Sequence, residues 1–227
     1  MTKSVCTLLS LFFVTSSFAQ VNMSPNILGA PFQGERFATK ASNDVEGSPL
    51  LFETWKSGTV SLANGEVYNV QKLNFDASTS TFIYSLKDTI YEIQNIVNQV
   101  EIDGENSDIP GSPTAMLFRN DLIPGQSNFV QVLLKGKITI LRQFSKKPEG
   151  ENYSNGVINE TRKYVLHSQD VALVKGKITP LAYSTSALNE LTVDKMKEIE
   201  SYIKAQHLKP KKGDDFLKAI SYYNSLS

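Results

Sequence analysis

Four carboxylate side chains lie close together near the middle of the chain and could bind a hard cation: Glu101, Asp103, Glu105 and Asp108. Calcium takes several oxygen ligands from a short loop of this kind. The spacing only half matches an EF-hand, because Asn106 occupies the glycine position and Ser112 stands where the bidentate acid belongs. The segment is therefore a calcium candidate, with a solvated acidic loop as the alternative. A hydrolase that uses these acids is a further hypothesis.

Histidine and cysteine chemistry is sparse, since the chain has only His167, His207 and Cys6. His167 is followed closely by Ser168 and Asp170, but a catalytic triad requires residues that meet in space, and no nucleophile-elbow motif accompanies them. We expect His167 to be a polar residue at a strand end. We expect His207 to lie at a helix C-terminus, where a cation is favourable. The sequence thus predicts no catalytic residue and no cofactor, and indicates a non-enzymatic protein.

The first 19 residues have the pattern of a secretory signal peptide. Lys3 precedes an apolar run at residues 5–14, and the small residues Ser17 and Ala19 predict cleavage before Gln20. An uncleaved N-terminal anchor is the alternative, but the run is too short to span a bilayer. The single cysteine lies inside this leader, so the mature chain would have no thiol, disulfide or thiolate metal site. No later segment is apolar enough to cross a bilayer as a helix.

The charge of the chain is balanced, with 23 basic and 23 acidic residues. Removal of the leader takes away Lys3 and leaves 22 basic against 23 acidic residues, a net charge of −1. No strong field is then available to attract nucleic acid or an anionic membrane. The remaining length is ample for one sizeable hydrophobic core.

The clearest strand signal is the segment FVQVLLKGKITILRQF at residues 129–144. Apolar residues alternate on both sides of Lys135-Gly136, which predicts a hairpin whose glycine supplies the positive φ of a two-residue turn. Leu133–Arg142 and Leu173–Ala182 are similar at an offset of 40 residues. This similarity indicates either an internal repeat or two hairpins with the same turn chemistry. Pro180 in the second copy predicts a sheet edge, or departure from the sheet.

The remaining strands are short and separated by turn signals. Asn64-Gly65 predicts a hairpin, and the apolar alternation changes phase across Gln71-Lys72, which predicts a β-bulge. Residues 20–50 are rich in Asn, Ser, Gly and Pro and are expected to be an extended or poorly ordered lead-in. The predicted fold class is mainly β (α+β), with a curved antiparallel sheet or partly open β-barrel over residues 51–184.

Residues 185–227 are expected to form two amphipathic helices packed on the β domain. The first would be capped by Thr192 and bury a stripe of apolar side chains, namely Val193, Met196, Ile199 and Ile203. The second is expected from Asp214 to Asn224. Its aromatic residues Phe216, Tyr222 and Tyr223 are a candidate partner face, with core packing as the alternative.

Three segments carry a resemblance: GSPLLFETWKSGTVSLANGEVYNVQKLNFD, the pair KYVL and LVKGKITPL, and KMKEIESYIKAQHLKPKKGDDFLKAISYYNSL. Together they resemble an uncharacterised group of exported proteins of Bacteroidota bacteria, over residues 47–227. The resemblance implies a Gram-negative envelope location, either periplasmic or associated with the outer membrane. It implies no catalytic residues.

Two functions of different class follow as hypotheses. The first is a non-enzymatic envelope protein that binds another envelope protein, for example as an accessory subunit of an outer-membrane-associated complex. The second is a periplasmic carrier of an apolar ligand such as a lipid, because a curved sheet covered by helices can enclose a pocket. A continuous apolar cavity would favour the carrier, and a filled core with an exposed docking surface would favour the binding protein.

Overall fold

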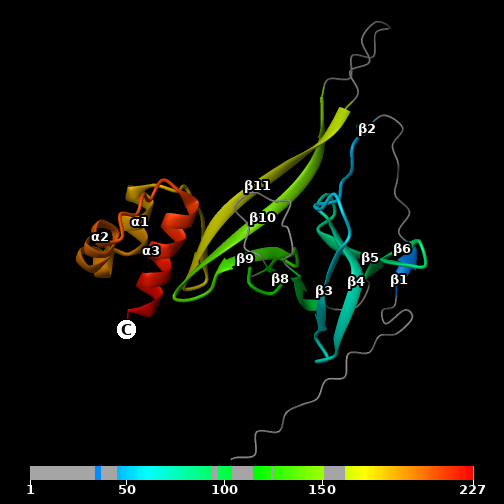
Figure 1. The fold of residues 1–227 in the computed structure, drawn as a ribbon, viewed down its shortest axis with the longest axis horizontal. Helices are drawn as coiled ribbons and strands as arrows, with labels where there is room; N and C mark the ends of the chain where they lie inside the picture. Colours follow the sequence, from blue (N-terminus) through cyan, green and yellow to red (C-terminus); the bar gives the residue numbers. More distant parts are fainter. Residues whose placement is uncertain are drawn as a thin grey trace, which may run out of the picture.

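The computed structural model describes residues 34–36, 45–93, 97–103, 115–123, 125–150 and 162–226. Twelve strands form one open, curved sheet, and helices follow at the C-terminal end (Figure 1). The predicted mainly β fold class with C-terminal helices is thereby confirmed. The predicted leader, residues 1–19, lies outside the described residues.

The sheet has the order β1-β6-β5-β4-β3-β7-β8-β9-β10-β11-β12. Neighbours along this order pair antiparallel, whereas β2 lies off the path and pairs with β11 in parallel. The strands β1 and β2 fall within the expected lead-in, so these parts of that segment belong to the sheet. The strands are β1 (Gly34–Arg36), β2 (Val45–Glu46), β3 (Lys56–Leu62), β4 (Val67–Asp76), β5 (Thr81–Leu86), β6 (Thr89–Ile93), β7 (Val97–Ile102), β8 (Met116–Arg119), β9 (Val130–Leu134), β10 (Ile138–Glu149), β11 (Arg162–Val174) and β12 (Lys177–Pro180).

Two local predictions in the β3–β4 pair are confirmed. The register shifts between Lys56 and Gly58, and the extra residue falls in β4 at Gln71-Lys72, where both side chains are exposed. This is the predicted β-bulge. The predicted Asn64-Gly65 hairpin joins the same two strands, and Gly65 has the φ of 89° that its turn requires.

The two similar Lys-Gly-Lys-Ile-Thr segments form hairpins with different turns. Lys175 and Gly176 have φ values of 50° and 79° and make a two-residue turn between β11 and β12. Gly136 does not have a positive φ, so its predicted role is wrong. A Cβ at Gly136 would instead stand 2.3 Å from Nδ2 of Asn224, so glycine is required for a close approach. β12 is the edge strand and ends at Pro180, as predicted, and both interpretations of the similarity stay open.

The C-terminal helix is fixed to the sheet at this close approach. The Oδ1 atom of Asn224 accepts a hydrogen bond from the N–H of Ile138 at 2.9 Å, and its Nδ2 donates to the Ile138 carbonyl at 2.8 Å. β9 has no residue paired with Ile138, so the Asn224 amide takes the place of a strand there. Lys137 also donates from Nζ to the carbonyl oxygen of Leu226.

A first core fills the β3–β8 part of the sheet. The rings of Phe75, Phe82 and Phe118 are fully or almost fully buried and contact one another, with centroid distances of 4.9, 5.3 and 5.6 Å. Tilted and edge-to-face contacts of this kind stabilise beyond the area that they bury. Phe144 from β10 joins this core, which links the long strand to the rest of the sheet.

A second core joins the helices to the end of β10 and β11. The helical region comprises α1 (Thr185–Leu191), the 3-10 turn η1 (Val193–Lys195), α2 (Met196–Ala205) and α3 (Gly213–Ser225). Fully buried apolar side chains from strands and helices meet there: Ile138, Ile140, Ala172, Leu188, Ile199, Phe216, Ala219 and Ile220. The helices therefore pack beside one end of the sheet (Figure 1).

Two details of the predicted helices are wrong. Thr192 ends α1, because its hydroxyl donates to the Leu188 carbonyl at 2.8 Å, and it makes no side-chain cap for the following turn. Val193 is 68% exposed instead of lying on the buried stripe. The predicted helix began at Thr192, so α1 was not predicted, and the 3-10 turn η1 occupies the place of the expected first turn. Within the part of the chain that the structure describes, no helix is long and apolar enough to span a membrane.

Replacement of Asn224 by alanine should lower the free energy of unfolding by about 1–3 kcal/mol, because the N–H and C=O of Ile138 lose their partner at the helix–sheet junction. Urea unfolding followed by circular dichroism measures this change. Ser221→Ala, at an exposed position of the same helix, is the matched control and should leave the midpoint in place. Equal midpoints for the two variants would contradict the assigned role of Asn224.

Candidate functional site

The longest strand of the sheet has an edge that no described part of the chain covers. β11 has 13 residues and pairs with β10 along one side. On the other side, β2 pairs with Arg162 and Lys163, and β12 pairs with residues 171–174. Among the described residues, no strand pairs with Tyr164–Gln169 on that side. We name this segment the β11 edge.

Local features of the chain mark the points at which β2 and β12 stop pairing with β11. Gly47 directly follows β2 and has a φ of 84°, which turns the chain away from β11 after two paired residues. Pro180 stands opposite Val171 and ends β12. The pairing reaches one residue further, where the N–H of Leu181 donates to the Asp170 carbonyl. The N–H that Pro180 lacks would point away from β11, as expected for proline in an edge strand. The uncovered length of the β11 edge therefore lies between Gly47 and the Leu181–Asp170 hydrogen bond.

The backbone groups of the edge point outward in an alternating pattern. The carbonyl of Asp170 accepts a hydrogen bond from the N–H of Leu181 at 2.9 Å, on the side away from β10. Because residues two apart in a strand direct their backbone groups to the same side, the N–H and C=O of Leu166 and Ser168 also point away from β10. These groups form a short row that a further strand can pair with.

Two neighbouring apolar side chains on the edge are exposed. Val165 is 37% exposed and Leu166 is 40% exposed, and successive residues of a strand point to opposite faces. Their cross-strand neighbours on β10 are Lys147 and Lys146, respectively, so neither has an apolar partner there. We call the part of the β10–β11 pair beyond Asp170, residues 145–149 and 162–169, the arm. Each face of the arm therefore presents an unmatched apolar side chain.

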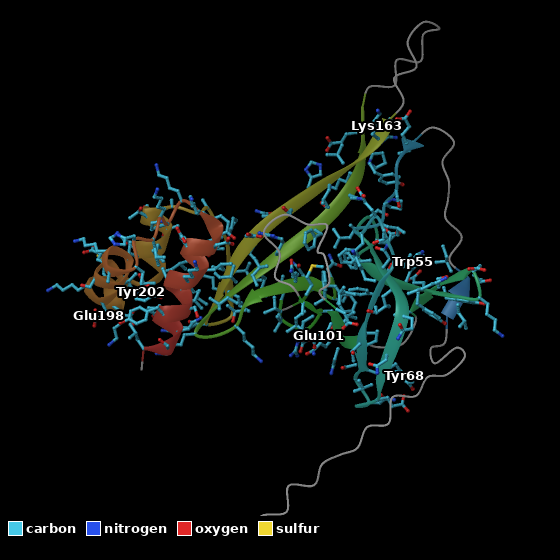
Figure 2. The ribbon with its side chains drawn as sticks, viewed as in Figure 1. Trp55, Tyr68, Glu101, Lys163, Glu198 and Tyr202 are labelled. Atoms are coloured by element: carbon cyan, nitrogen blue, oxygen red, sulfur yellow. The ribbon has the colours of Figure 1, made fainter. Side chains whose placement is uncertain are left out.

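The charged side chains of the arm are mostly basic. Lys163, near the far end of the arm (Figure 2), pairs with Glu46 of β2 at 3.0 Å. His167 contacts Glu149 at 2.6 Å between Nε2 and Oε1, and both side chains are half exposed. Lys146 donates from Nζ to the Leu50 carbonyl at 2.5 Å, and partial burial lowers its pKa below the ordinary lysine value.

A buried ion pair separates the edge from the helical core. Nε and Nη2 of Arg142 donate to the two carboxylate oxygens of Asp170 at 2.7 and 2.9 Å, and the two side chains are 14% and 7% exposed. The Tyr183 hydroxyl also donates to Asp170. The hydrogen bond to Asp170 raises the pKa of Arg142, whereas burial, followed by the hydrogen bond to Asp170, raises the pKa of Tyr183. This cluster fixes the position at which β11 leaves the helical core.

The predicted aromatic partner face is only partly at the surface. Phe216 is fully buried and packs against Tyr183 at a centroid distance of 5.3 Å, so it cannot contact a partner. Tyr222 is partly exposed and stacks on Tyr202 of α2 at 4.0 Å, and Tyr202 lies on the helical region in Figure 2. Tyr223 donates its hydroxyl to Asp194 at 2.9 Å. These tyrosines hold α2, α3 and η1 together.

Only two of the four predicted calcium ligands, Glu101 and Asp103, belong to the described part of the chain. Glu101 lies in β7 (Figure 2), and Asp103 accepts a hydrogen bond from the Ser57 hydroxyl at 2.6 Å. Glu105 and Asp108 lie outside the described residues. Among the described residues, no group of three or more His, Cys, Asp or Glu side chains is arranged to hold a metal ion. The calcium and hydrolase hypotheses therefore stay untested.

A polar hollow of about 390 Å³ lies beside His167, and its lining includes Ser78, Ser145 and Ser168. His167 stands within β11 and not at its end, and it contacts Glu149 instead of Asp170. In the described regions, no serine hydroxyl forms a hydrogen bond with this imidazole. The nucleophile–base contact of a triad is thus not formed in this geometry. His207 is exposed and follows the end of α2, as expected.

Comparison of the chain with models of known families, with curated proteins and with solved structures gives no match. The resemblance to exported Bacteroidota proteins stays a prediction. The function proposed for the chain depends on the geometry of its own residues.

The Tyr183–Asp170 contact predicts a component of the alkaline unfolding of the protein. The pKa of Tyr183 in the folded state lies above its unfolded value of about 10, so above that pH the folded state binds more protons than the unfolded state. Stability from this group is complete below about pH 10 and is lost as the pH rises further. Tyr183→Phe should therefore lose stability less steeply above pH 10 in urea unfolding. Parallel profiles for the two proteins would contradict the assigned contact.

Proposed function

We propose that the chain is a non-enzymatic, exported cell-envelope protein that binds another protein through the β11 edge. An accessory subunit of an outer-membrane-associated complex is the concrete form of this proposal. The observation that carries it is the six-residue row Tyr164–Gln169, which has outward backbone groups and two exposed apolar side chains.

Strand addition is a common way to recognise an extended segment. Main-chain hydrogen bonds supply affinity, and pockets or contacts for alternate side chains supply specificity. Proteins that must avoid such pairing place lysine or proline on the edge, shorten it or cover it. The sequence of the β11 edge, YVLHSQ, contains neither lysine nor proline. Its composition therefore favours pairing.

The ordered surroundings also favour binding on a preformed surface. β10 is a long, continuous partner for β11, and the Arg142–Asp170 pair and the helical core fix one end of the arm. Binding of a partner strand would cost little conformational entropy in the β11 edge, because the geometry of the edge is already fixed.

The alternative function, a carrier of an apolar ligand, requires an apolar cavity. In the described part of the chain, the centre of the β3–β8 core is occupied by contacting phenylalanine rings, and the helices pack at one end of the sheet. These observations support protein binding more than ligand transport. The envelope location rests on the leader pattern and the resemblance, and it is part of the proposal.

The edge can be tested with a pair of variants at Ser168. Its N–H points away from β10, so Ser168→Pro removes an outward donor and leaves the β10–β11 ladder in place. Pro148 already occupies a position of this kind in β10. Ser168→Ala keeps the N–H and is the matched control. We expect Ser168→Pro to capture the co-purifying protein about tenfold less well, equivalent to about 1.4 kcal/mol.

The measurement is a pull-down of the tagged protein from gently solubilised native membranes, with quantitative mass spectrometry of proteins and extracted lipids. A protein that is captured equally by both variants would exclude the edge as its binding site. A bound lipid without a protein partner would contradict the proposed function in favour of the carrier.

A further inference from the structure

We infer that the β11 edge binds an extended segment of another protein that carries apolar residues at its centre and carboxylates beside them. This inference rests on the proposed function and adds the chemistry of the partner. Three observations support it. They are the length of the unpaired segment Tyr164–Gln169 between β2 and β12 (the gap), the two unmatched apolar side chains, and the charge of the arm.

The length of the gap fits one strand of ordinary size. Strands rise about 3.3 Å per residue, so Tyr164–Gln169 spans about 20 Å. Five or six residues is also the commonest strand length in globular proteins. β2 and β12 stand at the two ends and limit the added strand to this length. A segment that pairs here must leave the sheet plane before it reaches either neighbour.

The same limits disfavour a second copy of the chain as the occupant. In a two-fold antiparallel pair of β11 edges centred on Leu166, Arg162 of one copy would lie opposite Asp170 of the other, because only the even-numbered residues direct their backbone groups outward. Leu181 already donates to the Asp170 carbonyl, and Val45 already stands opposite Arg162. The flanking strands of the two copies would therefore compete for the same space. A segment without flanking strands of its own has no such conflict.

The exposed side chains of the β11 edge favour an incoming strand that has apolar residues on both of its faces. Val165 and Leu166 lie on opposite faces, and each stands opposite a lysine of β10. Cross-strand apolar pairs stabilise a sheet by about 0.2–1 kcal/mol each. An added strand with apolar residues at two successive central positions supplies the pair that each side chain lacks.

The charge of the arm favours an acidic partner. The paired segments 45–46, 146–149 and 162–169 contain four cationic residues, Lys146, Lys147, Arg162 and Lys163, against the two carboxylates Glu46 and Glu149. The carboxylates of Glu53 and Asp76 also act on Lys146. The surplus of positive charge therefore rests on Lys147 and Arg162. Both carboxylates are already engaged, with Lys163 and His167. Lys147 is exposed and has no carboxylate partner among the described residues. Complementary charge on the incoming segment would raise its association rate and orient it on the edge.

Two display libraries test this chemistry. Each presents ten-residue segments with six randomised central positions, flanked at both ends by two glutamates in one library and by two lysines in the other. Selection against the purified protein should enrich glutamate-flanked segments with apolar residues at two successive central positions. The enriched segment is then synthesised with glutamate flanks and with lysine flanks, and its Kd is measured by fluorescence anisotropy for the protein, Ser168→Pro and Ser168→Ala.

We expect the glutamate-flanked peptide to bind at least about tenfold more tightly than the lysine-flanked one, with a ratio that shrinks as salt screens the charges. We expect Ser168→Pro, but not Ser168→Ala, to lose binding. Equal affinity for the two flanks, or enrichment from the lysine library, would overturn the acidic chemistry and leave the edge itself intact. Equal binding by both Ser168 variants would overturn the edge as the site.

Two further outcomes separate this inference from the proposed function. If neither library is enriched while the pull-down partner still depends on Ser168, the peptide chemistry is wrong and the proposed function stands. Sedimentation analysis of the free protein gives the other outcome. A dimer that dissociates in Ser168→Pro would identify a second copy as the occupant and would overturn the inference.

Discussion

The antiparallel pairing of β10 with β11 is the interaction on which the rest of the structure depends. All 12 residues of β10 have a partner in β11. On one face, Ile138 and Ile140 enter the helical core, whereas Phe144 enters the core of the β3–β8 sheet. On the other face, Leu141 and Val171 form a third cluster with Ile123 and Val130. One strand pair thus connects three hydrophobic clusters, and only a continuous ladder can hold them at fixed separations.

The buried polar residues of the β10–β11 pair lie at the boundary between the helical core and the core of the β3–β8 sheet. The Arg142–Asp170 pair stands between the part of β10 that faces the helices and the part that faces the β core. Asp170 is also the residue at which β12 ceases to cover β11. Beyond it, the arm continues with side chains that are mostly exposed and an edge that is unpaired in the described chain. The same ladder that supports the cores therefore also supports the proposed binding surface.

Local sequence signals predicted the features that depend on neighbouring residues. The bulge at Gln71-Lys72 followed from a phase change, and the edge position of β12 followed from Pro180. The role of Gly136 could not be predicted, because it depends on Asn224, which is distant in the sequence. β11 is continuous through the polar residues Ser168, Gln169 and Asp170, which carry no local strand signal. Pairing with β10 holds that polar stretch in the sheet.

The candidate site was largely missed for a related reason. Phe216 and Tyr222 were a candidate partner face with core packing as the alternative, because residue type does not distinguish a surface from a core, and Phe216 is buried. The β11 edge begins where Gly47 turns the chain away after β2, and it ends at the Leu181–Asp170 hydrogen bond beyond β12. A run such as YVLHSQ, whose apolar residues do not alternate, was the available signal.

Hydrogen exchange of the β11 amides tests the central claim most directly. In the free protein, the amides of Val165 and His167 point toward β10 and should be protected, whereas those of Leu166 and Ser168 should exchange rapidly. Protection of Leu166 and Ser168 that appears only when a partner segment is added would support strand addition. Protection of these two amides in the free, monomeric protein would show that another part of the chain already covers the edge, and would contradict the account.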